Sequence, residues 1–571
     1  MSRLSFLLVF LLISLPPSLQ ASLSPPRGFS INCGSKNVEN IEGIEWITDD
    51  SFVKVGNATD LNIPGIVPVL SSLRYFPDKS ARKYCYVIPA AKGAKYLIRT
   101  TYYYGGFDGG NEPPVFDQIV GGTKWSTVDT SENYAKGLAS YYEIIMASPG
   151  KALSVCLARN EHTMSSPFIS ALEVQHLEGS MYNSTDFAMY ALSTVARHRF
   201  GHGGQITSYP DDPFNRYWEP FVDANPVVDS QTNVTSFEFW NLPPAMAFLK
   251  ALTTSRGKNL TIQWPAVALP NASYYLALYF QDNRSPSPFS WRVFDVLVNG
   301  KTFYSGLNVS TGGVVVVGDN WPLSGLTELK LTPAVGSPVG PVINAGELSL
   351  VVPLGGRTLT RDVIAMEALA RSFDNPPSDW SGDPCLPRQN AWTGLTCSGG
   401  KIMRVVSLNL TNYGISGSIP SSIAKLTAIS SMEQTLWSYT RHELTQTSSF
   451  SALGKQPAKW NNFSITRIPS ETSRVISFFV KISAEQQSPR STSRQSKTEK
   501  GNHYSVSSVL GFSSSNSTKP FPAAKYLNLA TQQGVSWKLW SLISGRTKSV
   551  TRMQQSALSC EGFTEIMNQR L

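Results

Sequence analysis

Beyond its first residues, the sequence contains no apolar run long enough to cross a membrane. No later run reaches about 18 apolar residues, and the nearest candidate, Val475–Val480, is short and followed by Lys481. Charged residues make up only 16% of the chain against 41% hydrophobic residues, which excludes disorder throughout. The cysteines and histidines lack the clustered spacing of zinc ligands. We therefore expect folded domains with no membrane anchor, no metal and no cofactor.

The positive net charge is confined to the C-terminal quarter of the chain. The sequence carries 49 Lys/Arg and 40 Asp/Glu, a net charge of +9. Residues 429–571 hold 17 Lys/Arg and 7 Asp/Glu, a net charge of +10, which leaves 32 against 33, or −1, for the remainder. Because this basic segment shows no folding pattern, we expect no nucleic acid among the partners.

The N-terminus is typical of a secretory signal peptide. Arg3 precedes the apolar run Leu4–Leu15, which two prolines end, and small residues follow near Ala21. Residues 1–21 are therefore predicted to be a signal peptide, and the mature chain to be extracellular or on the cell surface. Eight Asn-x-Ser/Thr sequons lie before residue 429, of which Asn283 is set aside because Pro286 follows it. The other seven also predict a secreted glycoprotein: Asn57, Asn183, Asn233, Asn259, Asn271, Asn308 and Asn409.

Only one disulfide can be predicted from the six cysteines, because six cysteines allow 15 pairings. Cys385 and Cys397 lie twelve residues apart in one short segment, and we predict that they are bonded. The pairing of the other four stays open: Cys33, Cys85, Cys156 and Cys560.

Two successive blocks have the pattern of all-β domains. In residues 29–180, strands rich in β-branched and aromatic residues, such as Tyr96–Tyr104, alternate with turn signals about every ten residues. Residues 181–352 repeat the pattern, with the strand Tyr274–Phe280 and a hairpin turn at Asn299-Gly300. The simplest account is a tandem pair of β-sandwiches.

A third region starts near Thr358. Arg361–Ser372 has helical apolar spacing, and one leucine-rich repeat of about 24 residues has its strand at Leu408–Leu410. We assign residues 358–428 to a leucine-rich-repeat N-terminal cap and one repeat. The pattern then stops, and residues 429–571, with 28 serines and no aspartate, are predicted to be a disordered or aberrant tail.

Six motifs, in this order, resemble those of plant malectin-like receptor proteins with leucine-rich repeats. They are Ile31–Gly34, Leu73–Pro77, Tyr84–Tyr86, Tyr104–Gly109, Phe116-Asp117 and Asp211–Trp218. The likeness extends from about Phe29 to Leu426, about 70% of the chain, and Trp380–Cys397 resembles the disulfide cap that precedes plant repeats. The resemblance implies two packed β-sandwiches, a capped repeat region and a cell-surface role. Family members usually add a membrane helix and sometimes a kinase. The abrupt stop after one repeat predicts that this chain is truncated at its C-terminal end.

The resemblance also implies carbohydrate binding, because malectin holds short glucose oligosaccharides with loop aromatics and carboxylates. A sugar stacks its apolar face on an aromatic ring, while carboxylates accept hydrogen bonds from its hydroxyls. In the first block these residue types gather at a strand end among glycines: Tyr102, Tyr103, Tyr104, Phe107 and Asp108. A parallel group lies in the second block: Tyr279, Phe280, Asp282 and Arg284. Because alternating strand aromatics usually fill a core, a structural role for both groups stays open.

No catalytic constellation stands out. Asp211 and Asp212 are adjacent in a predicted turn, so we do not expect them to flank a glycosidic bond as a catalytic pair. His198 and His202 have the i,i+4 spacing of metal ligands, but the glycines around them disfavour a helix. No Gly-x-Ser-x-Gly elbow or P-loop occurs, and we expect a non-enzyme.

Two functions of different classes therefore remain. One is a carbohydrate-binding receptor-like protein that recognises glucose-type oligosaccharides or cell-wall glycans. The other is a non-catalytic co-receptor ectodomain that binds secreted peptides or other receptor ectodomains.

Overall fold

The computed structural model describes residues 28–234, 239–282, 284–285, 291–434, 462–467 and 478–483. The predicted signal peptide over residues 1–21 lies outside them. Strands dominate the described chain, which confirms the all-β prediction, and none of its helices is long and apolar enough to span a bilayer. The described residues divide into two compact units, one with residues 28–79 and 84–354, the other with residues 80–83, 355–434, 462–467 and 478–483.

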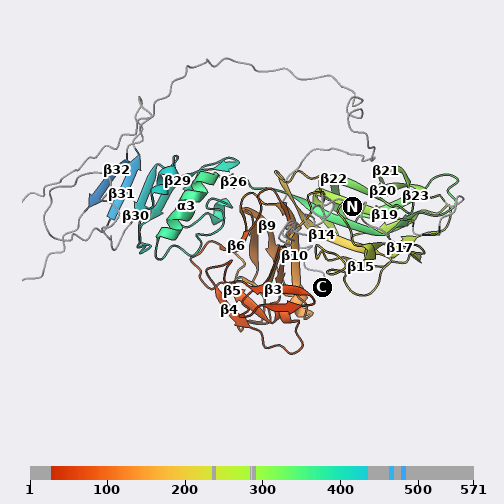
Figure 1. The fold of residues 1–571 in the computed structure, drawn as a ribbon, viewed down its shortest axis with the longest axis horizontal. Coiled ribbons are helices and arrows are strands. Elements are labelled where there is room, and N and C mark those ends of the chain that lie inside the picture. Colours follow the sequence, from red (N-terminus) through yellow and green to blue (C-terminus); the bar gives the residue numbers. More distant parts are fainter. Residues whose placement is uncertain are drawn as a thin grey trace, which may run out of the picture. The chain divides into compact units, whose positions relative to one another are not determined.

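An 11-stranded sheet runs through the first unit, from the red strands to the green strands of Figure 1. Its strands are, in spatial order, β2 (Glu39–Ile41), β3 (Ile44–Thr48), β1 (Gly28–Asn32), β13 (Ala171–His176), β7 (Lys95–Tyr102), β10 (Ser140–Ala147), β14 (Tyr190–Phe200), β25 (Ala345–Pro353), β19 (Leu269–Phe280) and β22 (Val314–Gly325), with β15 (Glu219–Phe221) beside β14. The two predicted blocks, here called the first half and the second half, meet where β10 pairs antiparallel with β14. Hydrogen bonding of the sheet therefore continues from one half into the other.

Smaller sheets accompany each half of the large sheet. The first half has β6 (Tyr84–Pro89), β11 (Ala152–Arg159), β8 (Phe116–Val120) and β9 (Thr123–Val128), and separately β12 (Phe168–Ile169), β5 (Ser72–Tyr75) and β4 (Asn57–Asp60). The second half has β18 (Leu260–Gln263), β23 (Glu328–Pro333), β20 (Val293–Val298) and β21 (Lys301–Asn308), and separately β16 (Val227–Asp229), β17 (Lys250–Thr253) and β24 (Val342–Ile343). The short helical segments of this unit are η2 (Pro68–Leu70), α2 (Ser131–Ala135) and η3 (Ala245–Phe248).

Apolar side chains between the two layers form the core of the second half. Leu278 and Leu348 of the large sheet join Val296 and Leu331 of the small sheet in one cluster, and all four are fully buried. Alternating residues of a strand face the same side, so each strand contributes every second side chain to this core. Each such burial stabilises the fold by about 1.5–3 kcal/mol.

Several strands predicted from the sequence are confirmed. The run Tyr96–Tyr104 appears as β7, which ends at Tyr102, and Tyr274–Phe280 lies within β19. Asn299 and Gly300 connect β20 to β21 with φ angles of 49° and 72°. A two-residue hairpin of type I′ requires positive φ at both positions, which Asn and Gly adopt most readily.

The second unit contains α3 (Thr360–Ser372), the helix predicted from apolar spacing. The helix buries Met366 and Leu369 in a cluster with Leu408 and Leu410 of β29 (Val405–Leu410). The other elements up to residue 434 are β26 (Arg357–Thr358), η4 (Arg388–Asn390), β27 (Leu395–Cys397), β28 (Ile402–Met403), η5 (Ser421–Lys425) and β30 (Ser431–Gln434).

The pairing of β30 with β29 bears on the predicted repeat. The two strands are parallel, and Ser407 lies opposite Ser431, an offset of 24 residues (431 − 407). This offset matches the predicted repeat length. The assignment of residues 358–428 to a leucine-rich-repeat cap and one repeat stays a prediction.

Three strands fall within residues 429–571, the predicted disordered or aberrant tail. After β30 come β31 (Asn462–Arg467) and β32 (Phe478–Ser483), and the sheet order is β27-β29-β30-β31-β32. Short aromatic and β-branched runs such as Phe478–Val480 have strand propensity even in a polar context. The assignment of residues 429–571 to a disordered or aberrant tail stays a prediction. The rest of the tail, with Cys560, lies outside the described residues.

Candidate functional site

The residues predicted to contact carbohydrate lie at the end of β7 and in the turn after it. Tyr102 and Tyr104 are 0% and 1% exposed. The Tyr102 hydroxyl donates to Oε1 of Gln118 over 3.0 Å, and its ring packs edge-on against three other aromatic rings. The Tyr104 ring packs edge-on against those of Phe107 and Tyr134. Neither tyrosine therefore offers a ring face to a sugar.

The remaining predicted residues, Tyr103 just before Tyr104 and Phe107 and Asp108 in the turn after it, keep contact with the surface. Tyr103 and Phe107 are half-buried, and Asp108 is exposed. The Asp108 carboxylate accepts hydrogen bonds from the Tyr104 hydroxyl and, at 3.0 Å, from the backbone N–H of Gly110. Burial alone would raise the pKa of Asp108, but the hydrogen bonds outweigh it and hold the pKa below its ordinary value. Sugar contact through these three residues stays a prediction.

The parallel group of the second half is occupied by its own contacts. Tyr279 and Phe280 are fully buried. The Asp282 carboxylate accepts from Nε of Arg284 at 2.7 Å and from Nε of Arg292 at 3.0 Å. These side chains therefore build the core and its ion-paired rim.

The Asp211–Trp218 motif forms a turn that Asp212 holds together, as its sequence predicts. Asp212 is fully buried, and its Oδ1 accepts from the backbone N–H of Phe214 at 2.8 Å. Its Oδ2 accepts from Nε of Arg216 at 2.8 Å and from Nε1 of Trp218 at 2.7 Å. Asp211 is exposed, so the two carboxylates have separate surroundings.

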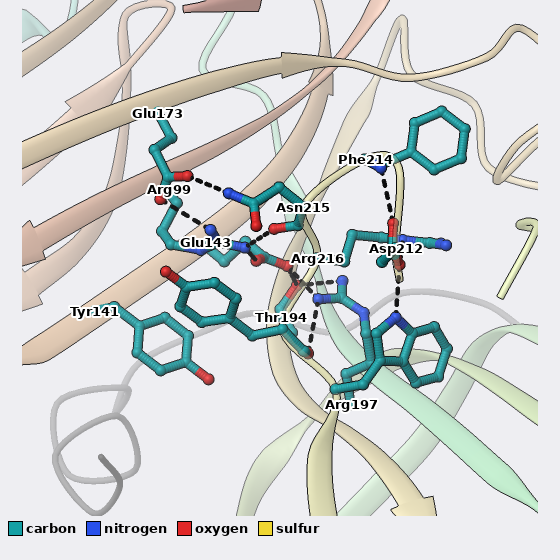
Figure 2. A network of polar contacts seen from close by, with 12 residues as sticks. Arg99, Tyr141, Glu143, Glu173, Thr194, Arg197, Asp212, Phe214, Asn215 and Arg216 are labelled. Carbon is teal, nitrogen blue, oxygen red and sulfur yellow. Dashed lines mark hydrogen bonds and ion pairs between the residues drawn. The ribbon is translucent and has the colours of Figure 1, made fainter. Parts of the chain in front are cut away.

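This turn meets buried charges of the first half, as Figure 2 shows. Arg99 on β7 donates to Glu143 at 2.9 Å and to Glu173 at 2.8 Å. Its Nη2 also donates to the backbone oxygen of Asn215 at 2.6 Å, and the Asn215 amide donates to Glu173 at 2.6 Å. The turn therefore supplies Arg99 and Glu173 with hydrogen-bond partners in addition to those on the strands of the first half.

Arg197 on β14 extends the cluster into the second half (Figure 2). Its Nη1 lies 2.6 Å from Oε1 of Glu143, and its Nε lies 2.9 Å from Oε2 of Glu347. Burial raises the pKa of both carboxyls, but Arg197 and the second arginine beside each carboxyl outweigh it and hold both pKa values below normal. Both groups are therefore ionised and paired, which suits a rigid junction and not general acid catalysis.

These junction residues are not among the candidates predicted from the sequence. Arg99, Glu143 and Arg197 each look like the polar face of a half-exposed strand, and their ion-pair partners lie 44 to 150 residues away. The one local signal for the junction is the Asp211–Trp218 motif. It predicts a turn but not the residues that the turn contacts.

The two histidines with i,i+4 spacing face different partners. Nδ1 of His198 accepts from Nε1 of Trp264 at 3.0 Å, and Nδ1 of His202 lies 3.3 Å from Nη1 of Arg199. Within the described ranges, no group of three or more His, Cys, Asp or Glu could hold a metal ion.

All seven predicted glycosylation sites are exposed: Asn57, Asn183, Asn233, Asn259, Asn271, Asn308 and Asn409. Exposure permits modification, and occupancy stays a prediction.

The structure contains the predicted Cys385–Cys397 disulfide and adds a second one. Cys85 on β6 is bonded to Cys156 on the neighbouring β11. Cys33 is a buried free cysteine.

Comparison with known proteins identifies the family. A family profile described as "Malectin-like domain" matches residues 31–351, from β1 into β25. The chain belongs to the malectin-like domain family. The family resemblance drawn from the six motifs is thereby confirmed.

Curated proteins that are similar to this malectin-like chain include two from Arabidopsis thaliana. "Probable LRR receptor-like serine/threonine-protein kinase PAM74" is 30% identical over 421 residues, covering 70% of this chain and 46% of the relative. "Probable LRR receptor-like serine/threonine-protein kinase MEE39" is 28% identical over 424 residues, with the same coverage. The chain thus spans about half the length of the curated relatives it matches.

Similar solved structures include the ANX2 ectodomain from Arabidopsis thaliana, at 16% identity and a TM-score of 0.48. Another is the plant peptide RALF23 in complex with FER and LLG2, at 18% identity and a TM-score of 0.47. Each match covers 57% of this chain and 96% of the solved chain.

Proposed function

We propose that this malectin-like chain is an extracellular, non-catalytic receptor-like ectodomain that binds peptides or partner ectodomains through the loops of its first half. The observation that carries the proposal is the uncharged apolar loop of residues 61–70 (LNIPGIVPVL). Pro64, Val67 and Pro68 are exposed, Val67 by 54%, and Ile63 is half-buried. Exposed apolar patches of this kind mark protein-interaction surfaces.

The apolar loop lies against the turn that follows Tyr104. A Cβ atom built on Gly105 would lie 2.7 Å from Cδ1 of Leu61 and 3.3 Å from Cδ1 of Ile63, so the turn backbone contacts the loop directly. Half-buried Phe107 belongs to the same turn. The Phe107 ring itself packs on Tyr75 and Phe168, so a partner that covers the loop lies beside this turn and contacts the apolar side chains of residues 61–70.

Recognition of glucose-type oligosaccharides or cell-wall glycans is the second candidate. Half-buried Tyr103 and Phe107, with the ionised Asp108, favour it. The burial of Tyr102 and Tyr104 counts against it, because stacking needs an open ring face. If this function holds, Asp108→Ala should weaken sugar binding by about 1–3 kcal/mol.

The test compares a glucan array with a panel of secreted peptides and purified receptor ectodomains, using the secreted full-length chain. Ile66→Asp with Val67→Asp should weaken peptide or ectodomain binding at least about tenfold, because each substitution places a charge in the apolar contact. Val335→Asp changes a fully exposed valine of the second half and should leave binding unchanged. Array binding that Asp108→Ala abolishes, with no peptide or ectodomain bound, would select the glycan function instead.

A further inference from the structure

Asn57 shares a row of the β12-β5-β4 sheet with the aromatic residues at its edge. Tyr75 of β5 lies directly opposite Asn57 of β4 on one side and opposite Phe168 of β12 on the other. Directly opposed side chains of antiparallel strands project to the same face, with Cβ atoms about 4.5–5.5 Å apart. Exposure rises along the row, from buried Phe168 through half-buried Tyr75 to exposed Asn57.

Phe107 completes an aromatic platform on this row. Its ring centroid lies 5.1 Å from that of Tyr75, with the ring planes tilted by 41°, and 5.3 Å from that of Phe168. Phe168 is fully buried, so the rings that keep open surface are those of Tyr75 and Phe107. Because β4 is the outer strand of this sheet, Asn57 borders the platform from the solvent side.

Asn57 is also the acceptor asparagine of the sequon Asn57-Ala58-Thr59. An N-linked glycan begins with an N-acetylglucosamine bonded to the asparagine side chain, and this sugar presents an apolar C–H face and an acetyl methyl group. Such faces pack on aromatic rings. We propose that Tyr75 and Phe107 form a platform that binds the first N-acetylglucosamine of the chain's own glycan on Asn57.

The platform has a consequence for other ligands. A glycan on Asn57 lies over Phe107, the ring on which free oligosaccharide recognition would depend. The aromatic edge then serves an attached sugar, and the apolar loop of residues 61–70 stays open for a partner. The two surfaces are distinct, so the platform can be tested independently of the proposed partner binding.

Asn308 offers a matched control within the same chain. It is likewise an exposed sequon asparagine in a strand, but its direct cross-strand partner is Val293 of β20, which has no ring. A glycan on Asn308 therefore has the same kind of attachment without an aromatic ring directly opposite it.

The experiment measures native-state release of each glycan by a peptide N-glycosidase, followed site by site with mass spectrometry on the secreted full-length glycoprotein. Release at Asn57 should be about 2- to 10-fold slower than at Asn308. One aromatic contact shifts the equilibrium between packed and free sugar by about this factor. Tyr75→Ala should abolish the difference, and Tyr75→Phe should preserve it because the ring face remains. Val293→Ala should change release at neither site.

Three results would overturn the platform. They are an Asn57 that carries no glycan, release at Asn57 as fast as at Asn308, and slow release at Asn57 that neither Tyr75→Ala nor Phe107→Ala accelerates. Release at Asn308 reports whether a variant is folded. If Tyr75→Ala accelerates release at both sites, Phe107→Ala decides the question.

Discussion

The guanidinium carbon of Arg99 lies 3.4 Å from the centroid of the Tyr217 ring. Arg99 belongs to β7 of the first half, whereas Tyr217 belongs to the turn that leads into β15 of the second half. A buried cation stacked on an aromatic face gains up to about 2 kcal/mol beyond its ion pairs. The contact therefore adds to the sheet continuity between β10 and β14 in joining the two halves.

Removing the cation should cost far more than removing the ring. Arg99→Met leaves the buried Glu143 and Glu173 without a shared partner and should lower the free energy of unfolding by about 3–5 kcal/mol. Tyr217→Leu keeps the ion pairs and should cost about 0.5–2 kcal/mol. Urea titration measures both, and the double variant should show a coupling of at least about 0.5 kcal/mol. Lys136→Met breaks the solvent-exposed pair with Glu132 and serves as the control, with a cost below about 1 kcal/mol.

The adjacent aspartates of the turn should respond differently to the same change. Asp212→Asn replaces an acceptor of three hydrogen bonds, one of them from Arg216, and should lower the free energy of unfolding by about 1.5–3 kcal/mol. Asp211→Asn changes an exposed side chain one residue away and should stay within about 0.5 kcal/mol of the parent. Equal effects in denaturant titration would contradict the role given to Asp212.

Local structure could be predicted from this sequence because its signals are local. The hairpin at Asn299-Gly300 depends on two residues that accept positive φ, and α3 depends on apolar spacing within thirteen residues. Tyr102 and Tyr104 are buried while Tyr103 between them is half-buried, and the sequence alone does not reveal which of these rings the fold covers.

The junction could not be predicted, because it depends on contacts between distant strands. The ion pair from Arg197 to Glu347 joins positions 150 residues apart. A charged residue within a strand normally indicates a solvated face, and only the tertiary pairing of β14 with β25 turns these two charges inward. The pairing of Asn57 with Tyr75 could not be predicted either, because the register between β4 and β5 is set by the whole fold.

The stability of the first unit should fall on mild acidification because of His202. Burial, with the nearby charge of Arg199, lowers the pKa of His202 to about 4. The unfolded chain has an ordinary histidine pKa near about 6.5, so it binds the proton first as the pH falls. The contribution of neutral His202 to the free energy of unfolding is therefore complete above about pH 6.5. About 1–3 kcal/mol of this free energy is lost as the pH falls towards 4.

Unfolding free energies measured between these pH values would check the expectation. His202→Gln should reduce the difference in unfolding free energy between these two pH values. His162→Gln, at an exposed histidine, should leave the slope as it is in the parent chain. An unchanged slope in His202→Gln would assign the acid sensitivity to other groups.

The cysteines should separate into two bonded pairs and one protected thiol among the described residues. Non-reducing peptide mapping should find Cys85 with Cys156 and Cys385 with Cys397. Burial raises the pKa of the Cys33 thiol well above its usual range, and the reactive thiolate is correspondingly scarce. Iodoacetamide should therefore modify Cys33 at least about 100-fold more slowly in the native protein than in denaturant, because both access and thiolate fraction are lost. Rapid labelling of Cys33 in the native chain, or its recovery in a disulfide-linked peptide, would contradict its place in the core of the first half.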